Sequence, residues 1–329
     1  MTLYKGIQGF SVQNLSADPT DPNEGQVWYN STSNVWKLTS ATTAGAWATS
    51  NNMNTAREVV GAGTQTEAVA FGGSVPPYTG ATEEYNGTSW TTNPTSLNTT
   101  RANLAGAGTQ TAALAFGGYP GVGTANTGAT EEYDGSTWTS NPTGLNTARS
   151  ELGGCGTQTA ALGFSGNPAP YTGATEEYDG STWATSPGSL ATGRAGLAGA
   201  GTQTAGLAFG GYLGAPGDSN ATEEYDGATW TAGGNLTVAV YRLAGCGTQT
   251  AGLGFGGNPP PGITTTQLYD GTTWANNPTG LNTGRLYLGG IGTQPSALAF
   301  GGQTGGSSTA ATEEWLGAGA ALTQTITVS

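Results

Sequence analysis

The chain has 329 residues, of which 58 are glycine, 35% are apolar and 9% are charged, and its net charge is −13. This composition is typical of a turn-dense all-β protein with enough large apolar side chains for a core. Eight basic residues and no histidine argue against nucleic-acid binding through phosphates and exclude Ser-His-Asp or Cys-His catalysis.

Residues 1–45 are expected to form an attachment segment with a β-hairpin, and the stretch before that hairpin is too short for a domain of its own. Residues 1–10 lack the basic start and apolar stretch of a secretory signal, and no apolar run could span a membrane. The Pro- and Asp-rich stretch from Asp18 to Glu24 is typical of a linker. Two strand-like runs, Gln26–Tyr29 and Asn34–Leu38, predict a hairpin. We expect the segment before it to order against a neighbouring subunit.

One phrase then recurs six times at intervals of 45 to 48 residues. It is Gly-Thr-Gln-Thr, with Pro last in the final copy, and it begins at Gly63, Gly108, Gly156, Gly201, Gly247 and Gly292. A period of this size is the signature of a propeller or a solenoid. We expect the phrase to form the turn between the two innermost strands of each repeat. Its six glutamines would form a ring of amides, for which turn stability and close packing are favoured over a ligand site.

Each copy predicts four short antiparallel strands, named a to d, which together form one blade. In the second copy Ala112–Phe116 is an apolar run closed by two glycines, and Ala129–Tyr133 is followed by Asp134-Gly135, a two-residue hairpin signal. Such a turn would place Tyr133 opposite Ser136, with its ring on the same side of the hairpin as Trp138. Because the aromatic pair recurs in nearly every copy, we expect it to pack between blades rather than stack on sugars.

Six pairs of strands a and b predict a six-bladed propeller that occupies residues 46–329. Residues 47–57 match the passage from strand d to strand a, so an N-terminal strand d can close the ring against the last strand c, Ala311–Trp315. The tail Thr323–Ser329 also resembles a strand and competes for that position. The alternative is seven blades, with Val27–Leu38 as the extra one.

An arginine precedes strand a in most copies, and a Glu-Glu pair lies in strand c. The fifth copy has Val240 in place of this arginine, with Arg242 displaced by two, and Gln267-Leu268 in place of the acid pair. The joint loss predicts an ion pair within each blade, preferably through the second glutamate, rather than an arginine ring that grips an anionic ligand. The candidate pairs involve Arg101, Arg149 and Arg194 with Glu84, Glu132 and Glu177.

The order Phe-Gly-Gly, Tyr-Asp and Trp, with an arginine before strand a, resembles the kelch repeat of β-propellers. The interval from Tyr to Trp is shorter than in the usual kelch pattern, which predicts a tighter c–d hairpin. The wording of residues 104–118 (LAGAGTQTAALAFGG) and 129–139 (ATEEYDGSTWT), with the leader at residues 3–38, resembles kelch-like propeller proteins of tailed bacteriophages, especially marine and cyanobacterial ones. That resemblance implies a virion component of tail-fibre or other type.

Binding is expected where the repeats differ, in the connections from strand b to strand c. These share a face of a propeller with the d–a connections, and variable loops on a rigid scaffold are the usual arrangement for binding. Loop drift without selection is the competing interpretation. The candidate contact residues are Tyr78, Tyr119, Tyr171, Tyr212, Asn167 and Asn258.

No catalytic, metal or cofactor site is expected. Cys155 and Cys246 share a repeat position two blades apart, which predicts buried, free thiols. The leading hypothesis is a non-enzymatic tail-fibre or receptor-binding subunit, made in the host cytoplasm, that adheres to a host-surface glycan or protein. Residues 1–45 would join other virion proteins, and the protein would be a homo-oligomer in the particle. The alternatives are a purely structural virion component, such as a capsid decoration or a tail or neck appendage, and, more remotely, a glycan-cleaving enzyme.

Overall fold

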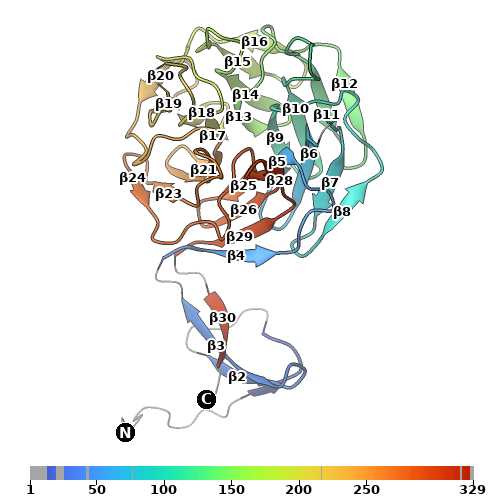
Figure 1. Cartoon of the computed structure of the whole chain (residues 1–329), viewed down its shortest axis with the longest axis vertical. Helices are drawn as coiled ribbons and strands as arrows, with labels where there is room; N and C mark the ends of the chain where they lie inside the picture. Colours follow the sequence, from blue (N-terminus) through green and yellow to red (C-terminus); the bar gives the residue numbers. More distant parts are fainter. Residues whose placement is uncertain are drawn as a thin grey trace. The chain divides into compact units, whose positions relative to one another are not determined.

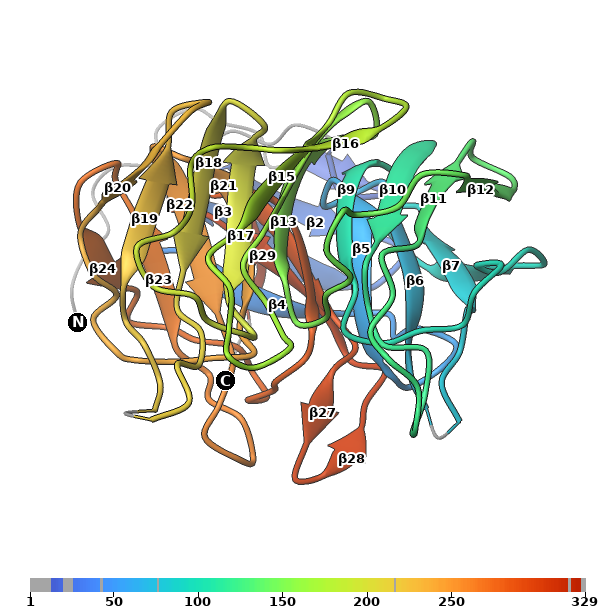
Figure 2. The same ribbon diagram turned by 90° about the horizontal axis from the view of Figure 1, so that it is seen from above.

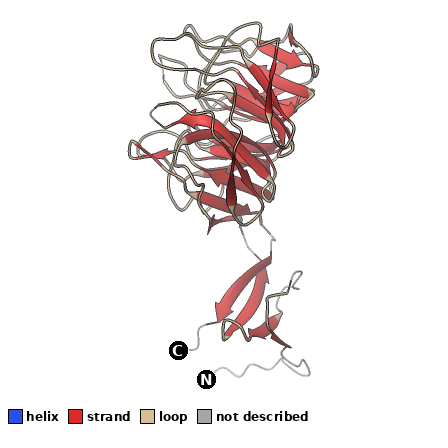
Figure 3. Ribbon diagram, turned by 90° about the vertical axis from the view of Figure 1, so that its right-hand side faces the viewer, coloured by secondary structure: helices blue, strands red, loops and turns tan. Residues whose placement is uncertain are grey.

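The computed structural model describes residues 13–19, 26–41, 44–75, 77–215, 217–318 and 321–326. These residues form strands, turns and loops without a helix (Figure 3). The chain divides into two compact units, one of Met1–Gly45 with Gly317–Ser329 and one of Ala46–Leu316. The boundary at residue 45 coincides with the expected one, whereas the tail from Gly317 onward belongs with the N-terminal segment.

The unit Ala46–Leu316 holds six four-stranded antiparallel sheets, which are the repeat blades. Blades 1 to 3 are β5 to β8 (Glu58–Gly63, Ala68–Ser74, Thr82–Tyr85, Trp90–Asn93), β9 to β12 (Ala105–Thr109, Ala112–Phe116, Thr130–Tyr133, Trp138–Asn141) and β13 to β16 (Gly153–Thr157, Ala160–Phe164, Thr175–Tyr178, Trp183–Thr185). Blades 4 and 5 are β17 to β20 (Ala198–Thr202, Ala205–Phe209, Thr222–Tyr225, Trp230–Ala232) and β21 to β24 (Ala244–Thr248, Ala251–Phe255, Thr266–Tyr269, Trp274–Asn276).

Blade 6 joins the two ends of this unit. It consists of β25 (Gly289–Thr293), β26 (Ser296–Phe300), β29 (Thr312–Leu316) and β4 (Ala46–Ser50), and β4 pairs with β29 from Ala46 opposite Leu316 to Ser50 opposite Thr312. Its b–c connection carries a small hairpin of β27 (Gln303–Thr304) and β28 (Ser307–Ser308), which extends beyond the neighbouring strands in Figure 2. The expected closure by an N-terminal strand d is confirmed.

The innermost strands of the six blades form a circle of contacts. Each of β5, β9, β13, β17, β21 and β25 contacts the next, and β25 contacts β5 (Figure 1). The repeat architecture is therefore all-β and propeller-like, as predicted. Small residues suit this position: a side chain on Gly154 would lie 2.7 Å from the Phe116 ring of the preceding blade.

The other unit contains a seventh four-stranded sheet, of β1 (Gln13–Leu15), β2 (Val27–Asn30), β3 (Val35–Ala41) and β30 (Ala321–Ile326). β2 and β3 form the expected hairpin, and β30 pairs with β3. The tail therefore does not close the ring, because β4 occupies the open edge of β29. Asp18 accepts hydrogen bonds from Trp28 and Asn30 of this hairpin, so the linker expected at residues 18–24 begins attached to it; residues 20–25 lie outside the described residues.

The c–d hairpin differs from the prediction. Tyr133 pairs directly with Trp138, so four residues connect the strands instead of two. The Asp134 carboxylate accepts hydrogen bonds from the backbone N–H groups of Ser136 and Thr137 at 2.8 and 2.7 Å, which stabilises the longer turn. The two rings still share one side, with centroids 4.9 Å apart, and both are buried as expected.

Every blade contacts the preceding one through the same two residue types, a tryptophan and a glutamine. The tryptophan that opens strand d packs on the preceding blade's phenylalanine, with centroids 4.7 to 5.1 Å apart, and donates to its threonine at 2.8 to 3.0 Å. The repeat glutamine donates to two carbonyls of that blade at 2.6 to 3.1 Å. Gln65 extends this pattern across the closure, to Ala297 and Trp315. The ring of amides is an inter-blade clamp.

The expected Arg–Glu ion pairs exist within the blades, but the prediction that the second glutamate is the partner was wrong. The first glutamate of each pair binds the arginine, in Arg57–Glu83, Arg101–Glu131, Arg149–Glu176, Arg194–Glu223 and Arg285–Glu313. These arginines are buried. Residues on one strand alternate between faces, so the second glutamate points to the next blade and accepts from its tyrosine, as Glu84 does from Tyr133, Glu132 from Tyr178 and Glu177 from Tyr225.

In the fifth copy, the Arg–Glu ion pair and the Glu–Tyr hydrogen bond are each replaced by other residues. Val240 replaces the arginine, and Gln267 replaces its acidic partner. Gln267 keeps the backbone hydrogen bond of that position, accepting from the N–H of Thr237 at 2.8 Å as Glu131 does from that of Asn98. Leu268 replaces the second glutamate, and the next blade carries Trp315 in place of the tyrosine, with Leu268 packed against its cluster. The prediction that the arginine pairs with the second glutamate would place Val240 against Leu268, and it is wrong because these side chains belong to two different contacts.

The clamp predicts a stability loss for Gln158→Ala. The change leaves the carbonyls of Ala113 and Tyr133 without their amide donor, and we expect a loss of about 1 to 3 kcal/mol. Thermal and denaturant unfolding of the full chain would measure it. Glu67→Gln, an exposed change on an a–b turn, is the control, and equal stability of the two variants would contradict the clamp.

The ion pair predicts a specific rescue. Arg149→Val alone leaves Glu176 buried without its partner and should cost about 3 to 5 kcal/mol. Adding Glu176→Gln reproduces the combination of the fifth blade and should recover most of that loss in the same unfolding measurement. Adding Glu177→Leu or Glu132→Leu should recover nothing, and a rescue by either would contradict the assignment.

Candidate functional site: the axial mouth

The b–c connections begin beside the residues that lead into strand a. Tyr119, Asn167, Tyr212 and Asn258 occupy one repeat position, each after the glycine or Ser-Gly pair that ends strand b. Their backbones bond to Ala102, Ser150, Ala195 and Tyr241, respectively, which are the residues after the repeat arginine or Val240. The structure therefore ties four of the six candidate contact residues to the entrance of strand a in their own blade.

The candidate contact residues fall into two groups. The rings of Tyr78 and Tyr119 lie 5.7 Å apart, and those of Tyr171 and Tyr212 lie 6.2 Å apart. Tyr78, Tyr119 and Asn167 line a hollow of about 340 Å³. Tyr171, Tyr212 and Asn258 line neither this hollow nor the cavity of about 170 Å³ beside it. The structure therefore brings three of the candidates together at this hollow. We call the hollow and the cavity beside it the axial mouth.

The residues that line the smaller cavity were not among the predicted contact residues. One residue from each blade, immediately before the Leu or Val that opens strand a, lines the smaller cavity; the six are Glu58, Asn103, Glu151, Gly196, Arg242 and Tyr287. Scaffold residues repeat, but these six positions hold five residue types. We call these six residues the axial set. The sequence could have indicated them, because this variable position lies directly beside positions that repeat in nearly every copy.

Five of the six residues of the axial set, all but Glu58, have a left-handed backbone conformation. Asn103, Glu151, Arg242 and Tyr287 have φ angles of 48° to 57°, the left-handed region that favours glycine, and Gly196 shares it at 62°. Backbone hydrogen bonds link neighbours around the axis: Glu151 donates to Asn103, Gly196 to Glu151, Arg242 to Gly196 and Tyr287 to Arg242. A non-glycine residue in this region costs roughly 1 to 3 kcal/mol, and such strain clusters at functional sites.

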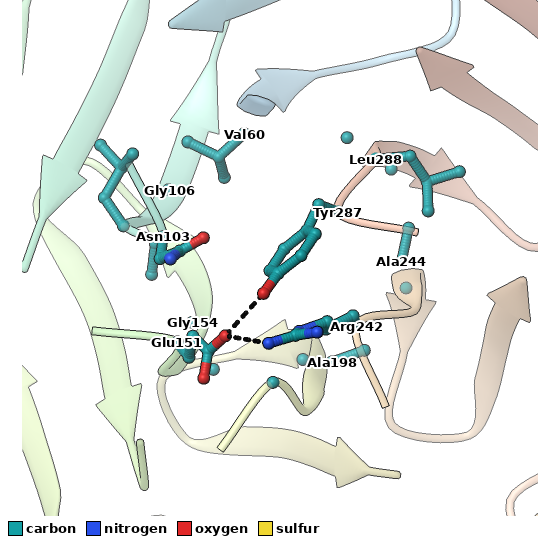
Figure 4. Close-up of a pocket in the computed structure, with 18 of the residues that line it drawn as sticks. Val60, Asn103, Gly106, Glu151, Gly154, Ala198, Arg242, Ala244, Tyr287 and Leu288 are labelled. Carbon is teal, nitrogen blue, oxygen red and sulfur yellow. Dashed lines mark hydrogen bonds and ion pairs between the residues drawn. The ribbon is translucent and has the colours of Figure 1, made fainter. Parts of the chain in front are cut away.

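Arg242 is the one of the six arginines outside a buried blade ion pair. Its side chain is 28% exposed, and a guanidinium nitrogen lies 3.4 Å from Glu151 Oε1. The same oxygen accepts a hydrogen bond of 3.0 Å from the Tyr287 hydroxyl (Figure 4). The guanidinium lies over the rings of Tyr287 and Tyr241, at 4.3 and 4.7 Å from their centroids. This group fixes the arginine through charge and cation–π contacts.

Burial or neighbouring charges raise the pKa values of three residues of the axial set, Glu58, Arg242 and Tyr287. Burial raises the pKa of Glu58, the charge of Glu151 raises it further, and Arg242 partly opposes this. Burial acts to lower the pKa of Arg242, but Tyr287 and Glu151 outweigh it, so that pKa lies above its usual value. Burial and Glu151 also raise the pKa of Tyr287. Glu58 has no hydrogen-bond partner for its carboxylate within the described chain and remains an available acceptor.

The described residues contain two cysteines but no cluster of His, Cys, Asp or Glu able to hold a metal ion. Cys155 and Cys246 are free and buried, as predicted, and burial raises the pKa of each thiol to about 12, which suppresses the reactive thiolate. No helix in the described part of the chain is long and apolar enough to cross a membrane.

No known protein-family model matches the chain, and no curated protein matches it.

The strain at the mouth predicts opposite effects of two small substitutions at Asn103. Glycine relieves the left-handed backbone, whereas alanine keeps the strain and lacks asparagine's tolerance of it. Asn103→Gly should exceed Asn103→Ala in stability by about 1 kcal/mol in thermal unfolding. The reverse order would contradict the assigned backbone conformation.

The raised pKa of Glu58 predicts a pH-dependent gain for Glu58→Gln. A carboxyl whose pKa is higher in the folded state is destabilising when ionised, so the substitution should stabilise the protein at pH 7. The gain should shrink as the pH falls through the raised pKa and vanish below the ordinary value of 4.5, where both states of the native chain are protonated. Thermal unfolding from pH 4 to 8, with exposed Glu67→Gln as control, measures it; a constant difference would contradict the prediction.

Proposed function

We propose that the chain is a non-enzymatic virion protein of a tailed bacteriophage, a tail-fibre or receptor-binding subunit that adheres to a host-surface glycan. Its propeller is taken to be a six-bladed kelch-type ring, which the circle of contacts among the six inner strands supports. The axial mouth and the b–c loops around it form the binding face. Residues 1–45, together with the tail strand β30, form the unit that joins other virion proteins in a homo-oligomer.

The observation that carries the proposal is the strained, variable axial set on an otherwise regular scaffold. The repeated arginines, glutamates, glutamines and tryptophans all have structural partners within or between blades. The axial set and the tyrosines beside it differ from blade to blade and line two adjoining hollows. A scaffold alone does not require Glu, Arg and Tyr where glycine is preferred, so ligand binding accounts for them best.

Binding of the labelled full chain to cyanobacterial cells tests the proposal. We expect wild type to bind cells of a host strain, and the loop variant Tyr78→Ser with Tyr119→Ser to lose most of that binding. Both tyrosines are half-buried on the loop face, and Tyr119 bonds to Ala102 through its backbone, so the fold should remain. Glu67→Gln is the matched control on the opposite face. Equal binding by the loop variant, or none by wild type across a strain panel, would favour the purely structural role.

A further inference from the structure

The axial mouth combines hydrogen-bond donors and acceptors within one small cavity. Glu58 offers a carboxylate with no hydrogen-bond partner in the described chain, while Arg242 and Asn103 bring donors to the same cavity. A buried Nε–H of Arg242 also lacks a partner there. A hydroxyl group both donates and accepts, so a ligand with several adjacent hydroxyls matches this mixed set.

The charge of the mouth disfavours an anionic ligand. Glu58 and Glu151 outnumber Arg242, the only basic residue of the axial set. Glu151 already lies 3.4 Å from the guanidinium and accepts from Tyr287 beside it. No uncompensated positive charge remains for a carboxylate, sulfate or phosphate, and the net charge of −13 adds a repulsive field.

A cationic ligand is disfavoured for a different reason. The Tyr241 and Tyr287 rings are contacted by the guanidinium of Arg242, at 4.7 and 4.3 Å. An incoming ammonium group would have to displace from these rings a cation that is held covalently in place. The aromatic surface left for a ligand is that of Tyr78 and Tyr119, which line the adjoining hollow.

We propose that the axial mouth binds the terminal residue of an uncharged saccharide, with Glu58 accepting from its hydroxyls and Arg242 and Asn103 donating to them. The inner cavity, of about 170 Å³, is smaller than the roughly 300–1,000 Å³ of a drug-sized site and suits a single sugar ring. The outer hollow, of about 340 Å³, shares Asn103, Glu151, Arg242 and Tyr287 with it. The rest of the glycan would leave past Tyr78 and Tyr119. The inference rests on the proposed adhesive function and names its ligand class.

Saturation-transfer NMR with the full chain tests this assignment directly. The neutral probes are the methyl glycosides of glucose, galactose, mannose and N-acetylglucosamine, and the acidic probes are N-acetylneuraminic and glucuronic acid. We expect transfer to at least one neutral probe and none above background to the acidic ones. Transfer to the acidic probes alone, or to no probe, would overturn the assignment.

Two variants locate the binding. Glu58→Leu should weaken binding of the neutral probe by about tenfold or more, because it removes the charged acceptor. Burial raises the pKa of this carboxyl, so its ionised form destabilises the fold and its removal should not unfold the protein. Thermal unfolding of the variant checks this. Exposed Glu67→Leu is the matched control and should bind like wild type. Unchanged affinity of the Glu58 variant would overturn the axial site.

The outcome separates the two levels of the account. If cells bind wild type but not the Tyr78 and Tyr119 loop variant, while Glu58→Leu binds cells normally, adhesion stands and the axial saccharide site fails. If a neutral probe binds through Glu58 but no cell of the panel binds the chain, the saccharide site stands and the adhesive function fails.

Discussion

The structure depends on contacts that each blade makes with the one before it. A single four-stranded antiparallel sheet cannot bury its faces alone, so its stability comes from stacking on neighbours. The repeat supplies an aromatic contact, an amide clamp and a Glu–Tyr hydrogen bond at these boundaries, as between Trp138 and Phe71, Gln158 and Tyr133, and Tyr133 and Glu84. The same clamp joins blade 1 to blade 6, where Gln65 donates hydrogen bonds to the carbonyls of Ala297 and Trp315. Closure therefore uses the contacts of any other boundary.

The repeated arginines and glutamates have structural partners within and between the blades. The Arg–Glu pairs lie inside blades, where the glutamate also accepts from the backbone leading into strand a, as Glu131 does from the N–H of Asn98 at 2.6 Å. The scaffold thereby fixes the residues that enter strand a next to the axis. Because this entrance is held by the ion pair and by backbone bonds to neighbouring blades, it tolerates left-handed residues with large side chains, such as Tyr287.

The sequence predicted the parts of the fold that repeat, and it failed where geometry depends on register. The period, the four strands per copy and the closure by residues 46–50 follow from local patterns. The c–d turn was predicted too short because Asp134-Gly135 suggested a two-residue turn, while the Asp134 side chain stabilises a four-residue one. The ion-pair partner depended on which face of strand c each glutamate takes, and one residue of register reverses that. Comparing the copies identifies residues that they have in common. It did not identify the axial set, because Glu151, Arg242 and Tyr287 occupy the same repeat position but are different residue types.

A crystal structure of the full chain soaked with the neutral methyl glycoside that gives the strongest NMR signal would test the central claim most directly. That claim is that the regular residues build the scaffold and the axial set binds the ligand. The account predicts density for one sugar ring in the axial mouth, with hydroxyls in hydrogen-bond distance of Glu58 and Arg242 and the blades unchanged. Density at the repeated residues instead, such as the c–d turns at Asp134 and its equivalents, would contradict it.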